Sequence, residues 1–238
     1  MIYVTGDVHG NQYRWKREIE PRLTDGDIII VCGDFGIGFW SKSYGCSEEE
    51  FFDYISEKSY TLLFIDGNHE NFTKLYSYPV EEWRGGKIHK IRHNLIHLMR
   101  GEVYNVEGRT IFTFGGGYSL DRKSRVENVT WWRQEMPTEE EYQNGLKNLE
   151  RVNFEVDIII THTAPSDSIY YLSTISAFHV NKIEMNEMPL NSFFNNIQGK
   201  VSYKNWFFGH FHCDRKIWKG QTALYNEVKE ISEGHCTD

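Results

Sequence analysis

The stretch Thr5-Gly6-Asp7-Val8-His9-Gly10 follows a short apolar run at the start of the chain, and the predicted fold is organised around it. It places a carboxylate and an imidazole two residues apart. In an extended strand, side chains at i and i+2 point to the same side, so Asp7 and His9 can reach one ion together. The flanking glycines allow a sharp turn around a bound group. Alone this is a modest signal, because many strands end in Asp and Gly.

Four later apolar runs are also followed by residues of types that commonly bind metals. One of them, Ile28 to Cys32, is a run typical of a strand buried on both faces. The five runs are followed by Asp7 and His9, by Asp34, by Asn68 and His69, by His162, and by His210 and His212. Open α/β sheets bind ligands at such strand ends. Each residue alone has a structural interpretation, as a turn aspartate or a hydrogen-bonded histidine, but together they favour a metal site.

The predicted ligands are Asp7, His9, Asp34, Asn68, His162, His210 and His212. Two carboxylates, one amide oxygen and four imidazoles suit manganese, iron, cobalt, nickel or zinc. Seven ligands are too many for one transition metal but fit two divalent ions that share a carboxylate. Such a pair has more positive charge than two aspartates offset, so it attracts hydroxide and an anionic substrate, most naturally a phosphate ester. We predict manganese, with the other four metals as alternatives.

Length and composition indicate one globular domain over residues 1–238, with 25% charged and 15% aromatic residues. The net charge of −8 argues against general nucleic-acid binding. No apolar run approaches the roughly 18 residues of a membrane span. A functional Asp7 leaves no room for a signal peptide, and the four cysteines show no paired spacing. We therefore predict reduced thiols and a cytoplasmic location.

Local signals predict several elements. Two capping boxes, Ser47 with Glu50 and Thr138 with Glu141, predict the starts of helices. Alternating segments on either side of Glu107-Gly108 predict a hairpin. The long polar and aromatic segment from residue 166 to residue 203 lies between two ligand blocks. Long loops in such places often form substrate walls.

Five short blocks carry a resemblance to a known family: Gly6-Asp7-Val8-His9-Gly10, Gly33-Asp34, Gly67-Asn68-His69-Glu70, Thr161-His162 and Gly209-His210-Phe211-His212. In this order they resemble the motifs of the calcineurin-like metallophosphoesterases, and they span nearly the whole chain. The resemblance implies an α/β fold, a four-layer α/β/β/α sandwich with two central mixed β-sheets. It also implies a metal-dependent phosphoric ester hydrolase that acts on a phosphorylated small molecule or nucleotide.

The resemblance further implies a role for each residue. Asp7, His9 and His212 would hold one metal, Asn68, His162 and His210 the other, and Asp34 would bridge them. A metal-bridging hydroxide would attack the phosphorus. His69 would contact the phosphate and protonate the leaving oxygen as general acid.

The chain departs from the protein phosphatases of this superfamily. They carry Gly-Asp-x-x-Asp-Arg-Gly in the second block and an arginine after Gly-Asn-His-Glu. Here Ile37 and Gly38 stand in the places of that Asp and Arg, and Asn71 follows Glu70. The carboxylate that would orient the catalytic histidine and two phosphate-binding arginines are missing from their usual places. This argues against a protein phosphatase and leaves the orienting partner of His69 unidentified.

Two alternative functions remain. One is a phosphodiesterase or nuclease acting on nucleotides or nucleic acid, and the other is a non-catalytic interaction module that retains the fold.

Two further features stand outside the motifs. Arg122-Lys123-Ser124-Arg125 can bind an anion, but a solvated basic loop is favoured. Trp131-Trp132 can stack on a base, but core or lid packing is at least as well supported.

Overall fold

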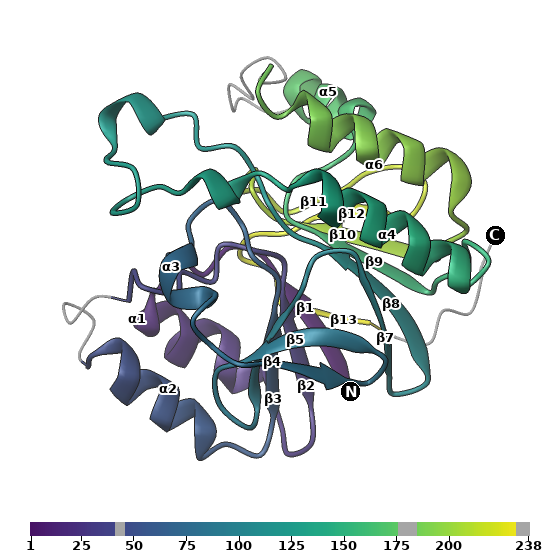
Figure 1. Cartoon of the computed structure of the whole chain (residues 1–238). Helices are drawn as coiled ribbons and strands as arrows, with labels where there is room; N and C mark the ends of the chain where they lie inside the picture. Colours follow the sequence, from purple (N-terminus) through teal and green to yellow (C-terminus); the bar gives the residue numbers. More distant parts are fainter. Residues whose placement is uncertain (41–45, 176–184, 232–238) are drawn as a thin grey trace.

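The computed structural model describes residues 1–40, 46–175 and 185–231, and its strands form two mixed sheets (Figure 1). The first sheet has the order β13-β1-β2-β3-β6-β5-β4 and the second β11-β12-β10-β9-β8-β7. The first contains β1 (Ile2–Thr5), β2 (Ile28–Val31), β3 (Thr61–Phe64), β4 (Val80–Trp83), β5 (Gly86–Lys90), β6 (Leu95–Leu98) and β13 (Lys229–Glu230). The second contains β7 (Glu102–Val106), β8 (Arg109–Phe114), β9 (Ile158–Thr161), β10 (Asn205–Phe208), β11 (Arg215–Lys216) and β12 (Gln221–Ala223).

Helices cover the outer face of each sheet (Figure 1). On the first sheet lie α1 (Gln12–Arg14), which continues as a π-helical turn at Trp15–Ile19 and a 3-10 turn at Glu20–Arg22, α2 (Glu48–Ser56) and α3 (Phe72–Leu75). On the second lie α4 (Glu139–Arg151), α5 (Ser166–Ile175) and α6 (Met188–Lys200). Both predicted capping boxes are confirmed, at the starts of α2 and α4. None of these described helices is long and apolar enough to cross a membrane.

The strands are apolar on both faces because each sheet is covered on both sides. In β2, Ile29 and Val31 pack with apolar residues of α2, whereas Ile28 and Ile30 pack against the second sheet. The same alternation in β9 sends Ile159 toward the helices of the second sheet. The result is three apolar layers between four structural layers. The predicted α/β/β/α sandwich with two mixed sheets is confirmed.

The middle of the chain contributes to both sheets. Strands β4, β5 and β6 extend the first sheet, and β7 pairs with β8 in the predicted hairpin of the second. The hairpin turn has positive φ at Glu107 (49°) and at Gly108 (76°), the pattern of a type I′ turn. Within residues 166–203, α5 and α6 cover the second sheet, and residues 176–184 lie outside the described part. Cys32, Cys46 and Cys213 carry free thiols, and Cys236 also lies outside the described residues.

Parallel pairing determines where the polar residues meet. Strands β1, β2 and β3 are parallel neighbours, and so are β9 and β10. Their carboxyl ends therefore lie at one edge of each sheet, and the two edges face each other across the sandwich. The backbone N–H of Gly209, after β10, donates to the carbonyl of His162, after β9, at 3.0 Å. All five motif blocks begin at this edge.

Candidate metal centre

The seven predicted ligands and His69 form one cluster at this edge. Three groups have side-chain ligand atoms within 4.8 Å of one another: Asp7 with His9 and His212, His9 with Asp34 and His69, and Asp7 with Asp34 and His162. Asn68 and His210 join the cluster through His162. The structure thus brings together every residue that the sequence singled out.

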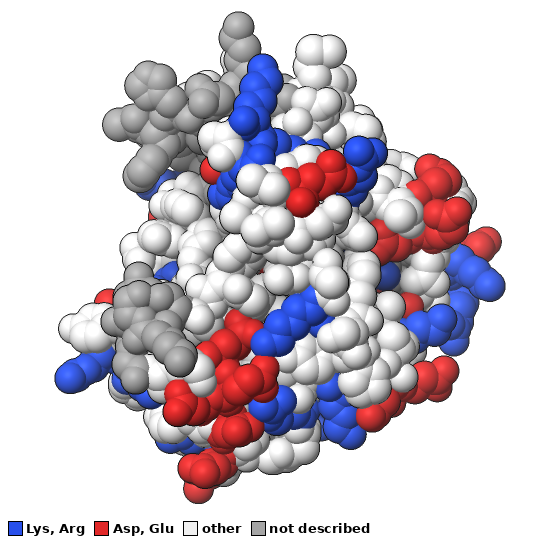
Figure 2. Space-filling view, turned by 60° about the vertical axis from the view of Figure 1, so that its left-hand side comes forward, with Lys and Arg blue, Asp and Glu red and all other residues white. Residues whose placement is uncertain are grey.

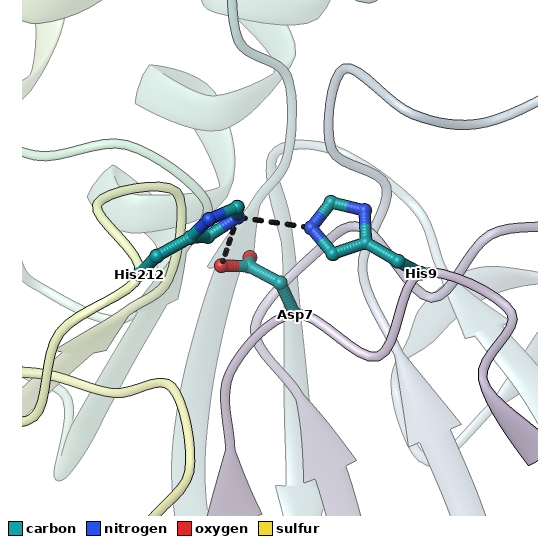
Figure 3. Close-up of side chains that lie close together, drawn as sticks. All are labelled: Asp7, His9 and His212. Atoms are coloured by element: carbon teal, nitrogen blue, oxygen red, sulfur yellow. Dashed lines mark hydrogen bonds and ion pairs between the residues drawn. The ribbon is translucent and has the colours of Figure 1, made fainter. Parts of the chain in front are cut away.

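The first group consists of Asp7, His9 and His212, whose side chains point toward one another (Figure 3). The Nε2 atoms of His9 and His212 are 2.9 Å apart. Nε2 of His212 is 3.5 Å from Oδ2 of Asp7. Ligand atoms bound at ordinary metal distances, at tetrahedral or octahedral angles, are separated by roughly 2.8–3.6 Å. The donors present here fit a divalent transition metal.

The second group is centred on Nε2 of His162. This atom is 3.1 Å from Oδ1 of Asn68, 3.2 Å from Nδ1 of His210 and 3.4 Å from Oδ1 of Asp34. Nδ1 of His162 lies 2.9 Å from the carbonyl oxygen of Cys32. A carbonyl only accepts, so it fixes the N–H on Nδ1 and leaves Nε2 of the neutral ring free to bind a metal. These donors also fit a transition metal.

Asp34 lies between the two groups, and 1% of its surface is exposed. Its Oδ1 faces His162, and its Oδ2 is 3.8 Å from Nδ1 of His9. Burial opposes ionisation of Asp34, but His162, followed by His69 and His9, together hold the pKa of Asp34 well below its usual range. Burial likewise lowers the pKa of His162, yet Asp34, assisted by Asp7, raises it to about 10. The carboxylates therefore favour positive charge here, and a bound cation would displace the His162 proton.

The backbone around the ligands is unusual. His9, Asp34, His210 and His212 have φ angles of 52°, 50°, 67° and 47°, in the left-handed region. Such angles are uncommon outside glycine and concentrate at functional sites. The extended-strand prediction for Asp7 and His9 is wrong in its geometry. β1 ends at Thr5, and a left-handed turn at His9 brings the two side chains to the same point.

At two motif positions only glycine fits, because a ligand carboxylate lies too close to leave room for a Cβ. A Cβ on Gly67 would clash with Oδ1 of Asp34, and a Cβ on Gly209 would clash with Oδ1 of Asp7. Each glycine directly precedes a predicted ligand and presses against another ligand from a different block. The motif glycines therefore set the distance between the loops and keep the donor atoms within reach of a shared ion.

Comparison with known proteins agrees with this architecture. The family model of the calcineurin-like phosphoesterases matches residues 1–214 of the 238. The chain belongs to the calcineurin-like phosphoesterase family. The comparison with curated proteins gave no match. The family is one of metallophosphoesterases, and this member has the buried Asp and His cluster that can hold the metal ions of such a hydrolase.

In this calcineurin-like phosphoesterase, an arginine lies beside His69. Nη1 of Arg125 is 3.0 Å from Nδ1 of His69, and Nη2 is 3.4 Å from Nε2. Arginine only donates, so His69 accepts from it through a ring nitrogen that carries no proton. Burial lowers the pKa of His69 to about 4; the Asp34 carboxylate opposes this shift, and His9 and Arg125 act in the same direction as burial. The imidazole ring of His69 is therefore neutral at pH 7 in the free protein.

The basic segment around residue 122 is not simply solvated, so the favoured interpretation is wrong for its two arginines. Arg122 forms an ion pair with the buried Glu135 at 2.9 Å and lies over the ring of Tyr118. Arg125 reaches the cluster, as described above. A usable signal was the position of this segment after β8, because β8 is parallel to β9 and ends at the same edge. Of the two tryptophans for which stacking and packing were both open, Trp132 packs in the core, with 1% exposed.

Glu187 is a second residue that the motifs do not reveal. It is buried at the start of α6, and its Oε1 accepts the backbone N–H of Tyr118 at 3.0 Å. The same oxygen is 3.7 Å from Nε2 of His210, the ring nitrogen that faces away from His162. Carboxylates behind metal-binding histidines orient the ring. Glu187 lies within residues 166–203, the segment between two ligand blocks that carries no motif.

A buried ion-pair network supports the loop that carries Asn68. Asp66 accepts from Nε and Nη2 of Arg100 at 2.8 and 2.6 Å, and His97 lies 3.1 Å away on the other side. Burial opposes ionisation of Asp66, but Arg100, followed by His97, lowers its pKa below the ordinary value. The contribution of Asp66 to stability is therefore complete at neutral pH and is lost as the pH falls below about 4.

Replacing Arg100 with methionine should destabilise the fold strongly, because it leaves the Asp66 charge buried without its main partner. We expect a loss of about 3–5 kcal/mol in the free energy of unfolding, measured by urea denaturation at pH 7. The matched control is Arg84→Met, which removes an exposed ion pair with Glu107 and should cost less than about 1 kcal/mol. Equal, small losses in the two variants would contradict a supporting role for Arg100.

Proposed function

We propose that this protein is a hydrolase that cleaves a phosphoester bond with the help of two divalent metal ions. Asp7, His9 and His212 would hold one ion, Asn68, His162 and His210 the other, and Asp34 both. The observation that carries the proposal is the presence of two donor groups with metal-ligand spacing on either side of one buried carboxylate. We propose manganese as the native metal, with iron, zinc, cobalt and nickel as alternatives.

When bound, the two ions would lower the pKa of a water between them to near neutrality and so supply the nucleophile. The protein's own residues supply charge, orientation and a proton. The two aspartates offset only part of the added charge, which favours an anionic substrate. His69 lies beside the ligands without being needed to hold either ion, and its protonated ring can donate to the leaving oxygen. A bound phosphate would raise the pKa of His69, because nearby negative charge favours the imidazolium.

The proposed substrate is a phosphorylated small molecule or a nucleotide. On the face of the molecule in Figure 2, basic side chains occur in small groups among acidic and uncharged ones, with no continuous basic surface. Together with the net charge of −8, this argues against polymeric nucleic acid as the main substrate. A non-catalytic module is disfavoured because such proteins would be expected to lose ligands or the acid. We also propose a single domain over residues 1–238 and a cytoplasmic location.

Removing metal should abolish activity. We expect dialysis against a chelator to eliminate hydrolysis of p-nitrophenyl phosphate and bis-p-nitrophenyl phosphate, and added Mn²⁺ to restore it. Mg²⁺ alone should restore little, because it prefers oxygen ligands and this donor set is rich in imidazole. Metal content is followed by mass spectrometry, with two ions expected per chain. Full activity in protein shown to be metal-free would refute the proposal.

A further inference from the structure

Arg125 is carried by an arm, residues 118–135, that leaves the sandwich after β8 and returns before α4 (Figure 1). The base of the arm is fixed to the metal centre. Nδ2 of Asn68 donates to Oγ of Ser119 at 3.1 Å. The carboxylate of Glu135 accepts from the backbone N–H of Ser119 at 3.3 Å and pairs with Arg122. The arm therefore presents Arg125 to the cluster from a defined position.

The protein holds the guanidinium of Arg125 through Nε and Nη1, and it leaves Nη2 without an oxygen acceptor among the described residues. Its Nε pairs with Asp121 at 2.8 Å, and its Nη1 donates to the carbonyl of Thr130 at 3.1 Å. Both Nη atoms lie at the ring of His69. Among the residues that the structure describes, no carbonyl or carboxylate oxygen accepts from Nη2. The side chain is 18% exposed, so part of it can contact a bound molecule.

A second arginine near the centre, Arg14, differs from Arg125 because the protein occupies both of its terminal nitrogens. The guanidinium of Arg14 is buried, and its Nη atoms donate to the backbone oxygens of Asp7 and Tyr225. It also lies over the ring of Tyr225. Arg14 thus supports the ligand loop from behind, with both terminal nitrogens occupied by the protein. Arg125 faces the side of the cluster where His69 lies and where a leaving group would be protonated.

We propose that Arg125 binds a non-bridging oxygen of the substrate phosphate and makes the centre selective for phosphate monoesters over diesters. The proposal rests on the phosphoesterase function above and specifies its substrate class. Guanidinium groups form strong charge-assisted hydrogen bonds with phosphate oxygens. A monoester carries close to two negative charges at pH 7, and a diester carries one. Because Coulomb energy scales with the product of the charges, one added cation stabilises a bound monoester more than a bound diester.

The test compares p-nitrophenyl phosphate with bis-p-nitrophenyl phosphate in manganese-loaded protein. Both release p-nitrophenolate, which needs no proton, so an indirect effect on proton donation by His69 does not enter. The wild type should prefer the monoester. Arg125→Met should lower kcat/KM for the monoester on the order of 10²-fold. The diester should lose about tenfold, since it carries half the charge.

Two further variants complete the design. Arg125→Gln keeps N–H donors on a shorter side chain but removes the charge, so it should show the same split between the esters and serves if the methionine variant does not fold. Arg133→Met is the matched control on the same arm, because Arg133 is 81% exposed and pairs with Glu127. It should change either activity by no more than about twofold.

Binding of inorganic phosphate, measured by calorimetry, gives a readout independent of turnover. We expect Arg125→Met to weaken it at least about tenfold with two metals still bound. Equal losses on both esters, unchanged phosphate affinity, or a wild-type preference for the diester would overturn the role of Arg125 and leave the phosphoesterase proposal standing. If metal-loaded wild type cleaves neither ester, the phosphoesterase proposal itself fails.

Discussion

Asp34→Asn is expected to remove both metals and nearly all activity. The carboxylate of Asp34 faces both donor groups, so its charge would act on each ion. Replacing residues that merely support metal ligands costs about 10–100-fold in metal affinity. Loss of a shared ligand should therefore cost at least about 100-fold at each site. Metal content after gel filtration and kcat/KM with added Mn²⁺ measure the effect.

The Asp34→Asn substitution removes the charge of the side chain and keeps its shape. Asparagine also tolerates the positive φ at this position, and its Oδ1 can still accept the backbone N–H of His69, which lies 2.7 Å from Oδ1 of Asp34. Asp53→Asn is the matched control, an exposed carboxylate on α2 that pairs with Arg92. It should leave metal content and turnover unchanged. An Asp34→Asn protein that keeps two tightly bound metals and wild-type turnover would show that Asp34 does not bridge.

His69→Ala is expected to preserve both metals and lower the rate according to the leaving group. A general acid contributes about 10²–10⁴-fold. The loss should approach this range for alkyl phosphoesters, whose leaving oxygen needs a proton, and be much smaller for p-nitrophenyl esters. The pKa of His69, lowered to about 4 by burial in the free protein, must rise in the substrate complex for this role. The loss of kcat on alkyl phosphoesters, compared with the loss on p-nitrophenyl esters, measures the contribution of proton donation.

Two results would assign His69 differently. Equal loss on both ester types would indicate phosphate binding without proton donation. Loss of a metal would indicate a ligand, a role that its closeness to His9 and Asp34 also permits. His93→Ala, at an exposed turn, controls for removal of an imidazole elsewhere. Circular dichroism and metal content establish that each variant is folded before rates are compared.

The sequence by itself determined the layers and the chemistry of the centre. A β-branched run such as Ile28 to Val31 has no polar face, so it can only lie in a sheet covered on both sides. Ligand type is a property of the side chain, so Asp34 and His162 indicated a transition-metal site before any distance was known. Capping boxes and the Glu107-Gly108 turn are local, and the structure contains them where expected.

Tertiary structure alone decided the geometry and the surroundings of the centre. The left-handed backbone at His9 and His212 sets the direction of their side chains, and residue spacing does not encode it. Arg125 meets His69 across 56 positions, and Glu187 approaches His210 from a segment with no motif. Such contacts depend on how far each loop extends beyond its strand and on what packs beneath it. A single sequence carries no local signal for either. The contact of Arg125 with His69 forms only when the two sheets have been brought face to face, and the contact of Glu187 with His210 forms only when α6 has packed on the second sheet.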